Sequence, residues 1–147
     1  MNNLPKLLLA FDFGTHRIGV AIGQTITQNA RPLKTIKAIA GIPSHDIVAQ
    51  LIKQWQPDAL IVGIPVDMDS AELSVTPQAR HFAEWLREHF HLPVHEVDER
   101  LTTKDAREKL FSQGGYKALQ DGQVDSVAAQ LILQNWLADI VTKGRKN

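Results

Sequence analysis

Three acidic residues occupy positions where the chain could use them for chemistry. Asp12 ends the apolar run of residues 7–11, Glu99 follows the strand-like segment 94–98, and Asp125 lies in the first turn of a predicted C-terminal helix. Burying a carboxylate is costly unless it is paired or binds a metal. Carboxylates that converge without basic partners repel one another, and a hard cation such as Mg²⁺ relieves this repulsion. Two such ions can activate a water and stabilise the leaving oxygen in phosphodiester hydrolysis.

Each of these acids also has an ordinary structural interpretation. Asp12 precedes Gly14 in a predicted tight turn, where Asp is a common residue. Glu99 can pair with Arg100 or cap a helix. Asp125 at a helix N-terminus is favoured by the helix dipole by about 0.3–1 kcal/mol. These interpretations do not explain why the central strand also ends on an acid, so both kinds of interpretation remain open at this point.

The elements that must position the acids follow from hydrophobic periodicity and from turn residues. Strands are predicted at residues 7–11, 18–22, 31–39, 59–64 and 94–98. Helices are predicted after the caps Ser44, Thr76 and either Thr102 or Thr103, and at residues 123–141. Pro32 predicts an edge position for the third strand, because proline lacks the N–H that a central strand needs. Gly41 and Pro43 are expected to break the chain, and Trp55 is expected to be a core residue.

The order of these elements predicts an α/β fold. The first three strands have short connections and should form an antiparallel meander, whereas each later strand returns through a helix and should run parallel to its neighbour. The result is a five-stranded mixed sheet flanked by helices, with the first strand where the two halves meet. Ligands bind beyond the carboxyl ends of strands at such a point. Asp12, the loop 65–74 and Glu99 are all expected at carboxyl ends of central strands.

Composition narrows the class of protein. The 147 residues predict a single domain, with about 138–147 forming a helix end and a basic tail. Cysteine is absent, so a metal would need oxygen or imidazole ligands. No apolar stretch approaches the length of a membrane span and no secretory pattern is present, so a cytoplasmic protein without membrane contact is expected. The 16 basic and 16 acidic residues balance, so nucleic-acid binding would need a local patch. Candidates near the hairpin are Arg17, Arg31, Lys34 and Lys37.

Four sequence blocks together resemble a known family. AFDFGTHRIGVAIG, LIVGIPVDMD, VDERLTT and VDSVAAQLIL occur in the order of the blocks of the YqgF family, also called RuvX, a Holliday-junction-resolvase-like branch of the RNase H-like superfamily. The resemblance covers the chain from residue 7 to about residue 137. It implies an RNase H-like fold and metal-dependent cleavage of nucleic acid. It also implies a role in maturing the 5′ end of pre-16S rRNA during ribosome assembly.

The resemblance assigns roles by position. It implies that Asp12, Glu99 and Asp125 are catalytic metal ligands, for Mg²⁺ or Mn²⁺, and that Arg100 contacts a phosphate. The loop after the fourth strand departs from the family pattern, because Asp67 stands where members have Asn and Ser70 where they have Gly. Asp67 adds negative charge close to the expected phosphate, and Ser70 restricts the backbone.

Several basic residues flank the predicted mouth of the site. We expect His16, Arg17, Lys104 and Lys117 to contact phosphates of the nucleic acid, an rRNA precursor or a pre-ribosomal particle. The six histidines include no pair at metal-ligand spacing on one helix face, so no zinc site is predicted.

Three other functions compete with this one. The DFGT hairpin also resembles the first phosphate loop of the actin and sugar-kinase superfamily, which predicts ATP binding, but those proteins clamp the nucleotide between two domains. An RNase H-like scaffold that binds RNA or protein without cutting would not need three converging acids. A Holliday-junction resolvase would cut branched DNA as a dimer. The sequence alone decides neither between RNA and branched DNA nor the oligomeric state.

Overall fold

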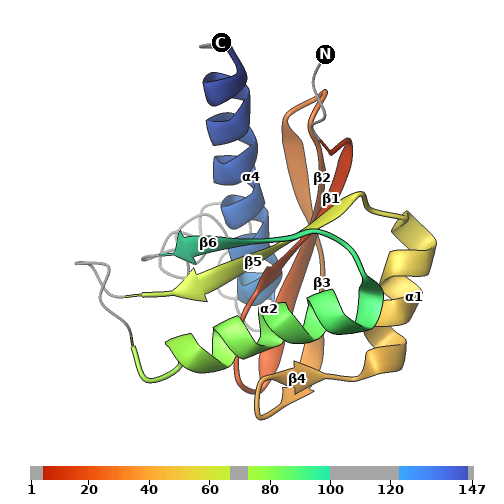
Figure 1. Cartoon of the computed structure of the whole chain (residues 1–147), viewed down its shortest axis with the longest axis vertical. Helices are drawn as coiled ribbons and strands as arrows, with labels where there is room; N and C mark the ends of the chain where they lie inside the picture. The colour runs from red at the N-terminus through yellow and green to blue at the C-terminus, as the bar shows by residue number, and fades with distance from the viewer. Residues whose placement is uncertain (1–4, 67–72, 100–122, 146–147) are drawn as a thin grey trace.

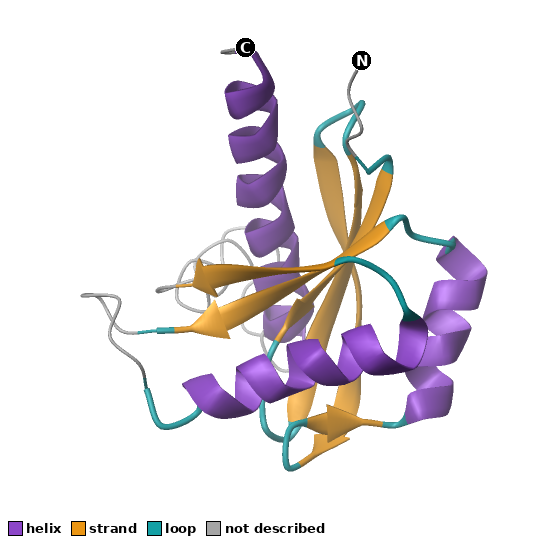
Figure 2. Cartoon of the chain, viewed as in Figure 1, coloured by secondary structure: helices purple, strands orange, loops and turns teal. Residues whose placement is uncertain are grey.

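The chain folds into a three-layer arrangement in which a mixed sheet lies between helices (Figures 1 and 2). The computed structural model describes residues 5–66, 73–99 and 123–145. The strands are β1 (Leu7–Asp12), β2 (Arg17–Gln24), β3 (Asn29–Ile39), β4 (Ile42–Pro43), β5 (Ala59–Pro65) and β6 (Val94–Glu99). The helices are α1 (His45–Trp55), α2 (Thr76–Phe90) and α4 (Gln123–Arg145).

The sheet confirms the predicted α/β topology and its central strand. Its order is β4-β3-β2-β1-β5-β6, with β1 antiparallel to β2 and parallel to β5. β2 and β3 are antiparallel, and β5 and β6 are parallel. β1 therefore joins the meander to the parallel half, as the connection lengths predict.

The prediction of five strands was one strand short. The expected break contains β4, which pairs with the end of β3 through Ala38↔Pro43 and Ile39↔Ile42. Two residues are too few to show a period in the sequence, so this strand could not be read from the pattern. Gly41 makes the turn before it with a φ of 83°, and a Cβ there would lie 2.7 Å from the ring of Phe13.

The positions of β6 and β3 in the sheet were predicted with different success. β6 was expected to be central but lies at one edge of the described sheet, so Glu99 ends an edge strand. The edge position predicted for β3 from Pro32 is confirmed only in part: β4 pairs with Ala38 and Ile39, and the Pro32 end of β3 lies at an edge of the described sheet. The register of β2 with β3 also shifts between Val20 and Ala21, next to this proline.

The helices follow the predicted segments with shifted ends. Ser44 is the N-cap of α1, as predicted, whereas Val75 takes that position in α2 and Thr76 is its first residue. The buried Thr76 hydroxyl donates to the Pro65 carbonyl at 2.6 Å and accepts from the Leu73 N–H at 2.8 Å, so it holds the start of α2 to the end of β5.

The C-terminal helix extends further than predicted. α4 ends at Arg145, where the sequence predicted an end at residue 141. The helix predicted from Thr102 or Thr103, and the loop positions Asp67 and Ser70, lie outside the described residues. Among the helices that the structure describes, none combines the length and apolarity needed to cross a membrane.

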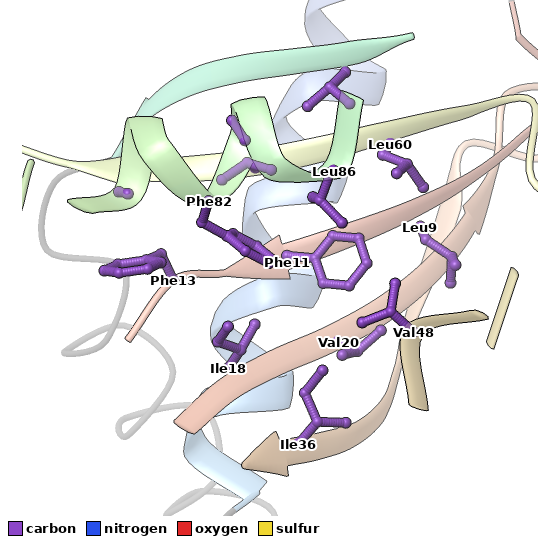
Figure 3. Packing of buried hydrophobic residues seen from close by; sticks show 14 of the residues in the cluster. Leu9, Phe11, Phe13, Ile18, Val20, Ile36, Val48, Leu60, Phe82 and Leu86 are labelled. Atoms are coloured by element: carbon purple, nitrogen blue, oxygen red, sulfur yellow. The ribbon is translucent and has the colours of Figure 1, made fainter. Parts of the chain in front are cut away.

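Each face of the sheet has its own core. α1 and α2 cover one face, where Val48, Phe82 and Leu86 pack against residues such as Phe11 (Figure 3). The rings of Phe11 and Phe82 meet edge to face at 5.6 Å between centroids. α4 covers the opposite face, where Ile132, Leu133 and Leu137 pack against a second, smaller cluster that includes Ala10.

Candidate active site

Asp12 lies on the face of the sheet that α4 covers. Side chains alternate along β1, and Leu8 and Ala10 belong to the cluster under α4, so Asp12 is the next position on that face. In the sheet it pairs with Gly19 of β2 on one side and with Gly63 of β5 on the other. The predicted acid at the end of the central strand is therefore only partly exposed and has a glycine on each side.

The two glycines let other elements approach Asp12 closely. A Cβ on Gly19 would lie 1.8 Å from the backbone oxygen of Asp125, so the first turn of α4 rests directly on the β2 backbone. A Cβ on Gly63 would lie 2.4 Å from the side chain of Ile132 and 3.7 Å from the Cβ of Glu99. Glycine at these two positions therefore makes room for α4 and for Glu99 beside Asp12.

The three predicted carboxylates influence one another in the folded protein. Burial, and after it the nearby charges of Asp125 and Glu99, raise the pKa of Asp12 from 3.8 to about 8. β1, β6 and the first turn of α4 thus bring the acids into one electrostatic unit, as their positions in the sequence predicted. Two further acids therefore lie beside a carboxyl group whose burial already opposes its ionisation.

The structure places the basic residue Arg17 at this site. Its Nε lies 3.6 Å from Oδ2 of Asp125, and its side chain is 64% exposed. The sequence predicted Arg17 as a phosphate contact, but the pairing with a candidate metal ligand was not predicted. Because most of its side chain is in solvent, Arg17 can leave Asp125 at little cost.

His16 lies in the same turn. Its Nδ1 is 2.9 Å from the hydroxyl of Thr15, and its carbonyl accepts from the N–H of Ala38. The side chain is exposed next to Arg17. The other predicted phosphate contacts, Arg100, Lys104 and Lys117, lie outside the described residues.

The donor set suits a hard divalent cation. No group of three acidic or histidine side chains within the described ranges is close enough to hold a metal by itself. Mg²⁺ commonly uses only one or two carboxylates and completes its shell with water and substrate phosphate. Carboxylate oxygens whose charges already raise a pKa fit such a cation by both chemistry and charge.

The glycines were the part of the site that the sequence reasoning missed. Within residues 18–23, Ile18, Val20 and Ile22 alternate with Gly19, Ala21 and Gly23. The large residues face the α1 and α2 side and the small ones face α4. A strand with this alternation predicts an element packed closely on its small face, and that signal was available in the sequence.

Comparison with known proteins identifies the family. The profile of the RuvX family, described as Holliday junction resolvase, matches residues 6–139. The chain belongs to the RuvX family. A RuvX relative from Legionella pneumophila (strain Paris), which carries the name pre-16S rRNA nuclease, is 55% identical over 135 residues, covering 91% of this chain and 97% of the relative. A relative of the same name from Aeromonas salmonicida is 52% identical, covering 91% of this chain and 96% of its own.

Solved structures support the RNase H-like fold of this RuvX chain. RuvC of T. thermophilus in complex with a Holliday junction aligns over 92% of this chain and 96% of its own, with a TM-score of 0.53 and 16% identity. The Fowlpox virus resolvase in complex with junction DNA aligns over 92% and 99%, with a TM-score of 0.55 and 12% identity. At these identities the likeness shows a shared fold.

Proposed function

We propose that this protein is a divalent-metal-dependent nuclease that acts in the cytoplasm on the 5′ end of the 16S rRNA precursor. Membership of the RuvX family supports phosphodiester hydrolysis. The name of the relatives at 52–55% identity supports the rRNA precursor as substrate.

The observation that carries this proposal is the coupling of Asp12 to Glu99 and Asp125. A fold gains nothing from a desolvated carboxylate with two more acids around it, since this arrangement opposes ionisation of Asp12. It is useful when a cation binds there. Strongly perturbed acids at the carboxyl end of a central strand are typical of functional sites.

Each residue has a proposed role. Asp12, Glu99 and Asp125 would hold Mg²⁺ or Mn²⁺, and the bound ion would supply an activated water and stabilise the leaving oxygen. Asp12 ends a strand that is paired on both sides, and it would fix the position of the site in the sheet. Asp125 is placed by the first turn of α4 where it rests on Gly19.

Arg17 would contact Asp125 in the free protein and a phosphate of the RNA in the complex. In the free protein it neutralises part of the charge of Asp125 at 3.6 Å. When a cation takes over that role, the guanidinium would turn to a phosphate oxygen of the RNA, an acceptor that suits its planar set of donors. His16 in the adjoining turn, and Arg100, Lys104 and Lys117 by sequence position, are proposed as further phosphate contacts.

Cleavage assays test the proposal and its substrate together. A labelled 5′ segment of the 16S precursor and a four-way DNA junction are incubated with the protein in Mg²⁺ or Mn²⁺, with Asp12→Asn and Asp46→Asn variants alongside. Asp46 is the matched control because its side chain is 94% exposed on α1, outside the acidic site.

The proposal predicts metal-dependent cleavage of the RNA that is lost in Asp12→Asn and kept in Asp46→Asn. Cleavage of the junction alone would move the substrate to branched DNA. Wild-type protein that binds RNA but cuts neither substrate would replace the nuclease with a binding scaffold.

A further inference from the structure

A cleft lies at the opposite end of the sheet from the acids. Its volume is about 280 Å³, and it opens between the end of α1 and the β2–β3 hairpin. Leu7, Ile22 and Trp55 supply apolar surface, and Gln24, Asn29 and Arg31 supply polar groups. Leu7 begins the strand that Asp12 ends, so the cleft and the acidic site lie at the two ends of β1. The volume is slightly below that of pockets for drug-sized ligands, about 300–1,000 Å³, and suits a smaller flat group.

An arginine side chain lies over the aromatic wall of the cleft. The guanidinium carbon of Arg31 lies 5.2 Å from the centroid of the Trp55 ring. Trp55 was predicted to be a core residue, but it is only partly buried and its ring reaches the cleft. Nucleobases stack on exposed aromatic rings, so a base that enters the cleft must displace Arg31 from the Trp55 ring, and the released guanidinium can then reach a neighbouring phosphate.

The charge of the surrounding surface selects the kind of ligand. Between Asp12 and Asp46 the sequence has no acidic residue, and the same stretch contains Arg17, Arg31, Lys34 and Lys37. The whole chain is neutral, with 16 basic and 16 acidic residues, so this β2–β3 region has an excess of basic residues. One acid, Asp58, adjoins the cleft, where its carboxylate accepts from the N–H groups of Lys6 and Leu7. A polyanion would be attracted to the β2–β3 region, and an acidic or neutral partner segment would gain less.

The cleft and the acidic site lie on opposite faces of the sheet, and β3 connects them. Arg31 and Lys34 pair with Ile22 and Val20, which face α1 and α2, whereas Lys37 pairs with Arg17 on the α4 side, so RNA on this path must cross the edge of β3. Arg31, Lys34 and Lys37 are all exposed along β3, and among the described strands the outer side of β3 is paired at Ala38 and Ile39 alone. Lys37 lies directly opposite Arg17, the residue that contacts Asp125. The six residue steps from Arg31 to Lys37 span about 20 Å at roughly 3.3 Å per residue.

We propose that the cleft binds a nucleobase of the single-stranded RNA whose backbone lies along β3. Lys37 and Lys34 contact successive phosphates between the acids and the cleft, Arg31 contacts the last phosphate, and the base stacks on Trp55. This RNA track, from the acids past Lys37, Lys34 and Arg31 to the cleft, accommodates roughly four nucleotides, at the lower end of the site sizes known for single-strand binding folds. This inference rests on the proposed function, because the strand that it positions is the one to be cut.

The affinity for short RNAs tests the proposed track independently of cleavage. Fluorescence anisotropy is recorded over a salt series with labelled single-stranded RNAs shorter and longer than the track, using the full chain with Asp12→Asn as background. Trp55→Leu removes the stacking surface, and Trp55→Phe keeps an aromatic ring. Arg31→Ala removes the cation, and Lys53→Ala, an exposed lysine on the last turn of α1 that does not line the cleft, is the matched control.

The proposal predicts a length-dependent effect. Trp55→Leu weakens binding of the longer RNA about 5- to 100-fold and leaves the shorter RNA almost unchanged, whereas Trp55→Phe restores most of the affinity. Arg31→Ala lowers the slope of log K against log salt by about 0.7, the value for one contact with a single strand. Lys53→Ala matches the background in both quantities.

The opposite results separate this inference from the proposed function. If Trp55→Leu and Arg31→Ala, shown by urea unfolding to be folded, bind the longer RNA like the background, the Arg31–Trp55 contact only joins α1 to β3 and the inference is wrong. If a free mononucleotide binds as tightly as the longer RNA, the cleft is a small-molecule site and the inference is also wrong. A background protein that binds no RNA of any length contradicts the proposed function as well.

Discussion

The two faces of the sheet are built from different residues and do different work. The face toward α1 and α2 is packed with large apolar side chains, among them the contact of Phe11 with Phe82. The face toward α4 has alanine and glycine at many positions and ends on Asp12. Large residues supply most of the burial free energy, about 1.5–3 kcal/mol for each fully buried side chain. Small residues allow α4 to approach the sheet closely, and the site needs this close approach.

One strand, β1, contributes residues to both faces of the sheet. Phe11 and Asp12 are neighbours in β1 and point to opposite faces, so the strand is anchored on one side and presents its carboxylate on the other. The α1 and α2 face therefore sets the stability of the fold, and the α4 face sets the geometry of the acids. Substitutions on the two faces should separate these properties.

The largest expected effect is a loss of stability on the α1 and α2 face. Phe82→Ala removes a fully buried ring and should lower the free energy of unfolding by about 3–5 kcal/mol, measured by urea denaturation. RNA cleavage per folded molecule should stay close to wild type, because Phe82 lies on the face away from the acids. Phe90→Ala, a partly buried ring on the same helix, should cost clearly less. Loss of cleavage by folded Phe82→Ala would mean that the faces are not separable.

The next effect concerns the geometry of the α4 face. In Gly19→Ala the new Cβ meets the backbone of Asp125, so α4 must move and we expect near-complete loss of cleavage with about 1–3 kcal/mol of destabilisation. The matched variant is Gly63→Ala, whose Cβ meets the end of the Ile132 side chain, which can change rotamer. It should keep more activity and more stability than Gly19→Ala. Equal results for the two variants would refute the role given to the first turn of α4.

Asp12 predicts a pH dependence of stability on the same face. Its native pKa of about 8 is above its ordinary value of 3.8, so the folded state holds the proton more tightly than the unfolded state. The free energy of unfolding should therefore fall as the pH rises from about 4 to 8 in metal-free buffer. Asp12→Asn removes this loss and should be more stable than wild type at pH 8 by several kcal/mol, because each pKa unit corresponds to about 1.4 kcal/mol. Thermal melts across this range measure it, and an Asp12→Asn variant no more stable at pH 8 than at pH 5, relative to wild type, would contradict it.

The smallest effect is expected at the exposed rim. Arg17→Ala removes a surface ion pair worth about 0–1 kcal/mol, so stability should barely change. RNA binding should weaken, with the salt slope lowered by about 0.7. Anisotropy titrations at several salt concentrations measure this slope. An unchanged slope would leave Arg17 as a partner of Asp125 alone.

The sequence predicted the parts of this fold that long patterns specify. The apolar run before Asp12 predicted the central strand, and the connection lengths predicted the antiparallel and parallel halves. The sequence did not predict β4, because a two-residue strand has no period. It also did not predict the edge position of β6, because an edge position depends on which strand pairs beside it. The acids could be named from their places at element ends. The contact of Arg17 with Asp125 could not, since it joins residues more than 100 positions apart.

Metal binding tests the central claim most directly, that the acids on the α4 face form a cation site. Mn²⁺ binding is measured by calorimetry for wild type, Asp12→Asn and the exposed control Asp46→Asn at pH 6 and pH 8. We expect wild type and Asp46→Asn to bind more tightly at the higher pH, because Asp12 must lose its proton, and Asp12→Asn to lose most of the affinity and of its pH dependence. Equal Mn²⁺ affinity for wild type and Asp12→Asn would contradict the account.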